Sequence, residues 1–491
     1  MGKLEINRRQ FLSKGIITTV AVGAGFSCLG QWITSGRPEL IDLKENSDIN
    51  SNIYYIDSKN GSDRNDGLKP DLAWKSLNFL DKIKLSPGDI VKFRRGSSFD
   101  KTLYIKYSGS KNNPILITDY GNPELYPPPA FTNPVFDPKN QIYGNCIRVE
   151  GSYIIIENLY FHNTVAELPK ETSGGFLTMW ELGAIYIDKR ARNCIVRKNE
   201  IFDCGAGIRS YGKNAIIEYN FIHDCNRVLK KYSWGPIAIW LGGDFQEVRY
   251  NRIFNYRAED SRFFWGQGYG GGADGGAIEI DDARNHKLHI HIHNNYTKDN
   301  QGFLEVELGD VAYNPIYKNF RVHHNISDDY QQFILWGGTN CRYENNTIVR
   351  RKVNANEWGV FNLVQNNSGN MIQNNIIVVE KGVVIFNNTR RQASGEGRKE
   401  IAQPKNIIRN NLYFAASGKL NFGEETKGES AMIWDPMFKN YSGSTKASDF
   451  SLLANSPAIN KGLYLGYKKD FTGIKIPQNS FPDLGAFEYV K

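Results

Sequence analysis

Methionine and long apolar stretches are both scarce in this sequence, which has 5 Met among 491 residues and a mean hydropathy of −0.48. After the first thirty residues no apolar run approaches the ~20 residues that span a bilayer, which excludes a bundle of membrane helices. Charged residues make up 23% of the chain and apolar residues 40%, a balance that excludes a disordered chain. Because a single core stops growing near ~250–300 residues, the chain is either several domains or an elongated repeat.

A strong charge of one sign is also lacking. The formal net charge is +8, and residues 1–30 contribute four basic residues and one acidic residue to it, so the remainder carries +5. A charge this small and dispersed does not indicate nucleic-acid binding, and we expect no nucleic-acid partner.

Cysteine is the third scarce feature, with six residues, of which five follow position 30. An odd number argues against a complete disulfide framework. Cys204 and Cys225 occupy equivalent places in two similar segments, so either a disulfide between them or a ladder of buried thiols fits the pattern. We favour the buried thiols.

The N-terminal thirty residues have the pattern of a targeting segment. They contain the run Asn7-Arg8-Arg9-Gln10-Phe11-Leu12-Ser13-Lys14. With the apolar stretch that follows over residues 16–29, this run resembles a twin-arginine signal. The resemblance implies a periplasmic, extracellular or cell-surface protein with a signal at 1–30, a linker at 31–51 and no stable transmembrane span after signal removal. A short membrane anchor, a buried helix or lipidation at Cys28 are the alternatives for this region.

A degenerate repeat organises residues 154–414. Each unit has an alternating apolar strand, an Asn corner and a second short apolar run, as in Ile216-Ile217-Glu218-Tyr219-Asn220-Phe221-Ile222. The corner residues are Asn158, Asn199, Asn220, Asn251, Asn294, Asn295, Asn325, Asn345, Asn346, Asn374, Asn375, Asn410 and Asn411. Units as short as 21 residues cannot bury an apolar face alone, so they must stack, and their period of two excludes a helical solenoid. The pattern predicts an all-β, right-handed parallel β-helix with an Asn ladder at its corners.

Both ends of the repeat resemble those of secreted pectate-lyase-like β-helix proteins. The motifs are Tyr55-Ile56-Asp57, Asn65-Asp66-Gly67, Trp74-Lys75-Ser76-Leu77 and Pro87-Gly88-Asp89 near the start, and Asp449-Phe450-Ser451-Leu452-Leu453 and Pro482-Asp483-Leu484-Gly485-Ala486-Phe487-Glu488 near the end. We expect a cap with first coils over 52–130, the β-helix over 131–430 and a C-terminal coil and cap over 431–491. Residues 74–83 read as a short amphipathic capping helix.

Outward residues of one predicted sheet form an acidic cluster. Aligning the strands at 185–188, 208–211, 237–240, 278–281, 304–307 and 333–336 by their inward apolar residues leaves two outward columns. The first column is Tyr186, Arg209, Ala238, Glu279, Glu305 and Ile334. The second column is Asp188, Tyr211, Trp240, Asp281, Glu307 and Trp336. Four carboxylates then occupy two rows about 4.8 Å apart, where they repel one another unless a metal, a cation or raised pKa values relieve them. A solvated acidic patch is the structural alternative.

Paired carboxylates suit glycoside hydrolysis, in which one protonates the leaving oxygen and another attacks the sugar or activates water. We predict Glu279, Asp281, Glu305 and Glu307 as catalytic residues. The predicted substrate-binding residues are Trp240, Trp336, Arg209, Tyr211, Tyr186, Asp188, Trp234 and Trp265. Trp234 and Trp265 lie on glycine- and aromatic-rich insertions that suit the wall of a cleft. We expect a poly- or oligosaccharide substrate and no cofactor or metal, unless the carboxylates bind Ca²⁺.

The segments Gly276-Ala277-Ile278-Glu279-Ile280-Asp281-Asp282 and Gln301-Gly302-Phe303-Leu304-Glu305 resemble the strands that carry the catalytic pair of β-xylosidase-type β-helix glycoside hydrolases. The resemblance implies that Asp281 is the nucleophile and Glu305 the acid/base. Two other functions stay open: a polysaccharide lyase acting on a uronate glycan, with Arg209 as charge neutraliser, and a non-catalytic carbohydrate-binding surface protein.

Histidines recur along one strand face. His289, His291 and His293 alternate, and His293 is expected to stack near His323, in a column shared with charged residues. We interpret this mixed pattern as a solvated strand face rather than a metal site.

Overall fold

The computed structural model describes residues 51–132, 145–164, 182–225, 236–257, 276–281, 286–306, 317–335, 337–351, 359–363, 368–387, 406–423 and 425–491. The predicted export signal and linker lie outside these residues. No helix among the described residues is long and apolar enough to cross a membrane.

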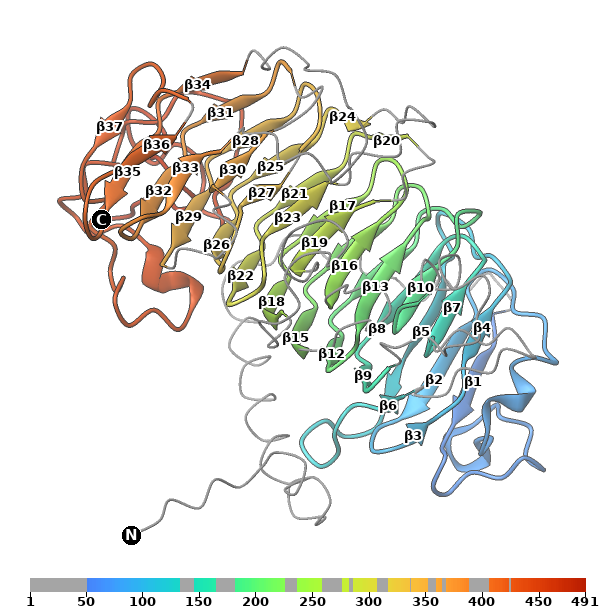
Figure 1. Cartoon of the computed structure of the whole chain (residues 1–491). Helices are drawn as coiled ribbons and strands as arrows, with labels where there is room; N and C mark the ends of the chain where they lie inside the picture. Colours follow the sequence, from blue (N-terminus) through green and yellow to red (C-terminus); the bar gives the residue numbers. More distant parts are fainter. Residues whose placement is uncertain are drawn as a thin grey trace, which may run out of the picture.

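Three parallel sheets run along an elongated solenoid, with early strands at one end and late strands at the other (Figure 1). Sheet A contains β1 (Ile53–Ile56), β2 (Ile90–Arg94), β5 (Ile115–Tyr120), β8 (Ile154–Glu157), β11 (Ile195–Arg197), β14 (Ile216–Glu218), β17 (Glu247–Arg249), β21 (His291–His293), β25 (Arg321–His323), β28 (Arg342–Glu344), β31 (Met371–Gln373) and β34 (Ile407–Arg409).

The other two long sheets alternate with sheet A along the chain. Sheet B contains β3 (Ser98–Phe99), β6 (Ala130–Phe131), β9 (Tyr160–His162), β12 (Glu200–Phe202), β15 (Phe221–Cys225), β18 (Arg252–Tyr256), β22 (Tyr296–Lys298), β26 (Ile326–Asp328), β29 (Thr347–Arg350), β32 (Ile376–Val379), β35 (Leu412–Ala415) and β37 (Met432–Ile433). Sheet C contains β4 (Leu103–Ile105), β7 (Ile147–Val149), β10 (Ile185–Ile187), β13 (Ala206–Ser210), β16 (Ile237–Leu241), β19 (Gly276–Ile280), β23 (Leu304–Val306), β27 (Ile334–Leu335), β30 (Phe361–Asn362), β33 (Val384–Phe386) and β36 (Asn421–Gly423).

Because each turn of the chain adds one strand to each sheet, the fold is a parallel β-helix, as the repeat predicts. A short pair, β20 (Lys287–Leu288) and β24 (Tyr317–Lys318), extends two adjacent coils. Inward side chains of the three sheets fill one continuous core, in which Phe131 stacks on Phe161 at a centroid distance of 5.7 Å and meets Phe93 edge to face at 5.1 Å.

The corners between sheets A and B hold the predicted Asn ladder. In each rung the side-chain amide donates to the side-chain oxygen of the next at 3.0–3.1 Å, along Asn199, Asn220, Asn251, Asn295, Asn325, Asn346, Asn375 and Asn411. The left-handed turn residue is the one before each ladder Asn, with φ between 50° and 58°. We expect one Asn at each corner both to adopt the left-handed conformation and to form the ladder. In the structure these two roles belong to adjacent residues, because the ladder side chain must point into the corner.

The N-terminal end differs from the prediction. Residues 74–83 do not form an α-helix; a 3-10 turn at Leu77–Phe79 follows another at Pro70–Leu72. Trp74 pairs with Ile56 in a bridge and stacks on Tyr54 and Phe79, at centroid distances of 5.6 and 5.3 Å. These tertiary contacts override a helical pattern too short to be stable by itself.

The C-terminal segment runs back along the outer face of sheet B. Phe450, Phe471 and Phe487 pack with outward residues of β22 to β35 in a second apolar cluster, and a 3-10 helix spans Ala447–Phe450. Figure 1 shows this segment folded beside β29, β32 and β35. Cys204 and Cys225 are buried thiols that are not joined in a disulfide, as predicted.

Candidate active site

Two acidic residues of sheet C face each other on neighbouring coils. Glu279 of β19 is in register with Glu305 of β23, and the strict alternation of Ile278-Glu279-Ile280 fixes both side chains outside the core. Glu279 is 4% exposed, Glu305 5% and the adjacent Asp281 4%. The predicted pairing of Glu279 with Glu305 is confirmed, and the carboxylates are buried, which argues against a solvated acidic patch.

The position predicted for Trp240 is wrong by two residues. Trp240 stands in register with Arg209 on one side and Glu279 on the other, so it belongs to the first outward column. Ala238, which we expected in that place, lies in the core. Ile237, Ile239 and Leu241 are all apolar and share one alternation phase, so this row allows two registers that differ by two residues, and the structure adopts the one that buries Ile239 and Leu241 in the core.

Gly242 takes the place expected for Trp240. A side chain at residue 242 would meet the Tyr211 ring, whose nearest carbons lie 2.1 and 2.4 Å from the Cβ position. The Tyr211 ring therefore fills the space between its own row and that of Asp281, and glycine is required there by space rather than by backbone conformation.

The row after Glu305 is shifted by one residue. Ile334 pairs with Leu304 and Leu335 with Glu305, so Ile334 faces the core and not the outward column as predicted. The predicted row is apolar at all four positions, so it carries no alternation from which its phase can be read. Trp336, Glu307, Trp234 and Trp265 lie outside the described residues.

A buried arginine supplies the cation that the acidic rows require. Arg209 is 2% exposed, and its guanidinium carbon lies 3.6 Å from the centre of the Trp240 ring. Burial lowers its pKa, whereas the charges of Glu279 and Asp281 act to raise it. One face of the Trp240 ring, itself 1% exposed, is thus occupied by a cation rather than open to a sugar.

Further along the same face, basic and aromatic residues continue the column. The Arg148 guanidinium lies 4.4 Å from the Tyr186 ring centre, and the Tyr186 and Tyr211 rings are 5.8 Å apart. Asp188 contacts Arg190 at 2.8 Å and Arg148 at 3.7 Å. Burial works to raise the pKa of Asp188, but the hydrogen bonds from Arg190 and the two positive charges lower it overall. Asp188 is therefore an ionised partner of arginines.

His293 and His323 are not solvated, contrary to our interpretation. His293 is in register with His323 on the outer face of sheet A, and they are 9% and 6% exposed. The nearby C-terminal segment covers them, with Tyr467 at 4.2 Å from His323 between ring centroids. His289 lies in a left-handed turn with φ 55°, so it does not continue the strand that carries His291 and His293.

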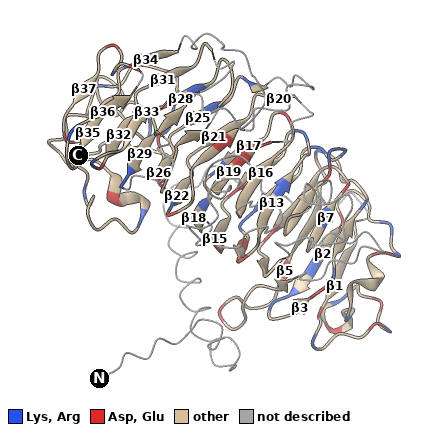
Figure 2. Cartoon of the chain, viewed as in Figure 1, with Lys and Arg blue, Asp and Glu red and all other residues tan. Residues whose placement is uncertain are grey.

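Charge is mixed along the molecule. In the view of Figure 2, Lys and Arg are interspersed with Asp and Glu along the described residues, and each of the three long sheets carries charges of both signs. The cluster of Glu279, Asp281 and Glu305 is therefore a local feature of sheet C.

No protein-family model matches the chain. A lacto-N-biosidase from Bifidobacterium longum subsp. longum is 38% identical over 86 residues, which are 17% of this chain and span only 5% of that protein. XylC in complex with xylose has a TM-score of 0.52 at 13% identity, over 89% of this chain and 98% of that chain. Pectate lyase Pel9A has a TM-score of 0.53 at 13% identity, over 89% and 96%. These likenesses confirm the resemblance in fold: the chain is a pectate-lyase-like parallel β-helix.

Proposed function

We propose that this protein is an exported carbohydrate-active enzyme, a glycoside hydrolase that cleaves a poly- or oligosaccharide with the carboxylates of sheet C. The register of Glu279 with Glu305, both buried, is the observation that carries the proposal. Like charges directly opposite one another weaken a sheet, so a structural role gives no reason to retain them. The names of the similar proteins, a lacto-N-biosidase, XylC with xylose and a pectate lyase, support a carbohydrate substrate.

The reaction assigns each carboxylate a task. A protonated carboxyl donates its proton to the glycosidic oxygen as the bond to the anomeric carbon breaks, and an ionised carboxylate attacks that carbon or removes a proton from water. Resemblance gives Glu305 the acid/base role and Asp281 the nucleophilic role. Arg209 stacks on Trp240 two rows before Glu279, and its positive charge favours the ionised form of the carboxylates on this face.

The strand register relates the active pair to stereochemistry. Directly opposed residues such as Glu279 and Glu305 have backbones about 4.8 Å apart, which suits the ~5–5.5 Å carboxyl separation of a retaining enzyme. Asp281, the residue directly after β19, lies two residues beyond Glu279 and is therefore diagonal to Glu305. A diagonal pair is separated by about 7–8 Å, which leaves room for the water of an inverting enzyme, and in that case Asp281 acts as the general base on water instead of as the nucleophile. The anomer released therefore reports which pair acts.

A polysaccharide lyase is the second candidate, and the likeness to pectate lyase Pel9A favours it. A lyase needs a cation that reaches the uronate carboxylate of its substrate. Arg209 is buried against Trp240, and the opposed residues of β19 and β23 are acids, not the Lys or His that abstracts a proton. These features favour the hydrolase.

Product analysis separates the candidates. The mature protein is incubated with aryl glycosides, neutral glycans and uronate polymers, and reducing ends and ultraviolet-absorbing unsaturated ends are measured together. A hydrolase releases reducing ends without unsaturated ends, a lyase releases both, and a binding protein releases neither while retaining affinity. The expected result is reducing ends alone; unsaturated ends, or binding without turnover, would refute the hydrolase.

Export is tested separately. We propose that the twin-arginine-like run directs the protein to the periplasm or cell surface. Arg8→Lys together with Arg9→Lys should leave the protein in the cytoplasm of a bacterial host, whereas the wild-type protein is found in the periplasmic or membrane-bound fraction. Equal export of the two would contradict the assignment.

A further inference from the structure

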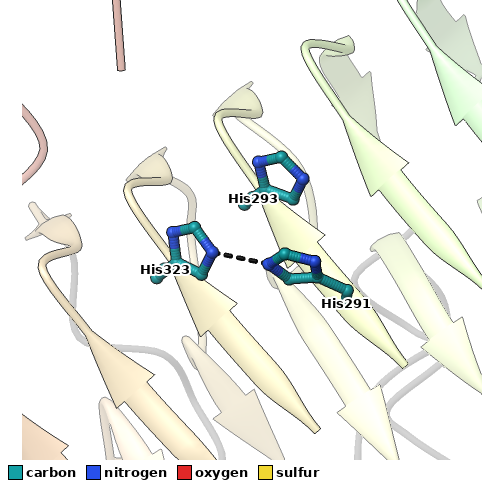
Figure 3. A group of neighbouring side chains, drawn as sticks. All are labelled: His291, His293 and His323. Atoms are coloured by element: carbon teal, nitrogen blue, oxygen red, sulfur yellow. Dashed lines mark hydrogen bonds between the residues drawn. The ribbon is translucent and has the colours of Figure 1, made fainter. Parts of the chain in front are cut away.

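Four histidines gather on the outer face of sheet A, away from the acidic rows of sheet C. His291 and His293 belong to β21 and His323 to the adjacent β25, and one nitrogen from each ring lies within 4.8 Å of the others. The Nε2 atoms of His291 and His323 are 2.5 Å apart (Figure 3). His324, the fourth, follows β25 directly. Three ring nitrogens thus converge from two neighbouring strands.

The orientation of His293 is fixed by its neighbours. Its Nδ1 lies 2.6 Å from the side-chain oxygen of Asn294, whose amide nitrogen donates to the Asp470 carbonyl at 2.9 Å. The Asn294 oxygen therefore faces His293 and accepts its Nδ1 proton. The other nitrogen, Nε2, lies 2.8 Å from Oε1 of Glu247, on β17. A carboxylate and an imidazole nitrogen consequently meet at the edge of the cluster.

His323 links the cluster to a buried fourth ring. Its Nδ1 lies 2.8 Å from Nδ1 of His324, which is 1% exposed and whose Nε2 has no hydrogen-bond partner among the described residues. If Nδ1 of His323 donates to His324, then its Nε2 offers a lone pair toward His291. Metal-binding histidines commonly have this second hydrogen bond.

We propose that His291, His293 and His323 bind one divalent transition-metal ion of the zinc class, with the Glu247 carboxylate as a fourth ligand. Zn–N bonds of about 2.0–2.1 Å place tetrahedral ligand nitrogens roughly 3.3 Å apart, so the pair now at 2.5 Å has only to separate by less than an ångström. Imidazole nitrogens suit zinc, nickel or copper rather than calcium or magnesium. Arg249 donates to the same Oε1 of Glu247 at 2.8 Å, so coordination by Glu247 uses its other oxygen or displaces Arg249.

The predicted role of the ion is structural. Four protein ligands close the coordination sphere and leave no position for a substrate. The ligands come from three consecutive strands of sheet A, so one ion would join three coils. The Tyr467 ring packs at 4.2 Å from His323 and 4.9 Å from His324, and its hydroxyl donates to Glu344. The ion would thereby also hold the ring against which the C-terminal segment docks.

Metal binding is measured on the mature protein after removal of metal with a chelator. We expect about one equivalent of Zn²⁺ per chain after desalting, a higher thermal midpoint with Zn²⁺, and the intense visible absorption of four-coordinate Co²⁺ when Co²⁺ replaces it. His323→Gln and His291→Gln should each weaken Zn²⁺ binding at least tenfold. The matched control is His289→Gln, because His289 is exposed, stacks on Phe245 and lies outside the cluster.

Two results would overturn the proposal. The first is a wild-type protein that retains no more Zn²⁺ than the double variant with His291→Gln and His323→Gln. The second is a Co²⁺ spectrum typical of the hydrated ion. The spectrum is recorded on wild-type protein, so it decides the question even if a variant fails to fold. Glycan cleavage enters neither readout, so the outcome is independent of the proposed hydrolase activity.

Discussion

Replacing one ladder residue, Asn325→Leu, tests how the coils are held together. The Asn325 side-chain oxygen accepts from the backbone and side-chain nitrogens of Asn295, at 3.0 Å each. Its amide nitrogen donates to the carbonyls of Ile292 and His323 and to the side-chain oxygen of Asn346, at 3.0–3.1 Å. Leucine has a similar volume but makes none of these bonds. All five hydrogen bonds lie in a buried corner, and Asn325 itself is 0% exposed.

The expected cost is about 3–5 kcal/mol. The buried backbone N–H of Asn295 loses its partner, which costs about 1–3 kcal/mol, and the remaining lost bonds contribute about 0.5–1.5 kcal/mol each before partial compensation. Denaturant unfolding followed by circular dichroism measures the change, and hydrogen exchange should place it in β21 to β28, since coils stabilise their nearest neighbours.

Asn122→Ala is the control for this prediction. Asn122 is exposed, and its side chain accepts one hydrogen bond, from the Glu124 backbone at 2.9 Å. Its loss should change stability by about 0.5 kcal/mol or less. If Asn325→Leu were no more destabilising than Asn122→Ala, the ladder would not be a source of stability.

Two further predictions concern the C-terminal segment and the outward face of sheet C. Burial, reinforced by the charges of Asp483 and Asp470, raises the pKa of Glu488 to about 7. A raised carboxyl pKa means that the stability contributed by Glu488 is fully present below about pH 4.5 and is lost as the pH rises through 7. The free energy of unfolding of the wild type should therefore fall by about 1–2 kcal/mol over this interval, after allowance for solvent screening. Glu488→Gln should lose less, and identical pH profiles of the thermal midpoint for the two proteins would contradict this. Gly242→Ala should cost about 1–3 kcal/mol because its Cβ overlaps the Tyr211 ring. Adding Tyr211→Ala should recover part of that loss in thermal unfolding, and full additivity of the two changes would refute the steric explanation.

The fold and the acidic pair were predictable because each depends on unambiguous alternation. In Ile278-Glu279-Ile280 only one phase buries the isoleucines, so Glu279 had to point outward. The row containing Trp240 allows two registers that differ by two residues, and the row containing Leu335 is apolar in both phases, so the register of each depends on packing against neighbouring coils. Sequence periodicity carries no information about that packing.

The histidine cluster could not be predicted from local pattern for a different reason. His293 and His323 stand in a column with Arg249 and Glu344, a mixture typical of a solvated face. Their burial depends on Tyr467, which is more than a hundred residues away in sequence. One signal was present: His293 and His323 each lie two residues before a ladder Asn, so the repeat alone places them in register.

The measurement that tests the proposed function most directly is glycan cleavage by Glu305→Gln. On the glycan that wild type cleaves best, loss of the acid/base group should lower the rate of reducing-end release by about 10²–10⁴-fold, with Asp281→Asn or Glu279→Gln similarly impaired according to which is its partner. Glu157→Gln is the control, because Glu157 pairs with Arg197 on sheet A at 2.5 Å and should retain full activity. If Glu305→Gln folds with the wild-type thermal midpoint and cleaves at the wild-type rate, the active site is not on these rows of sheet C.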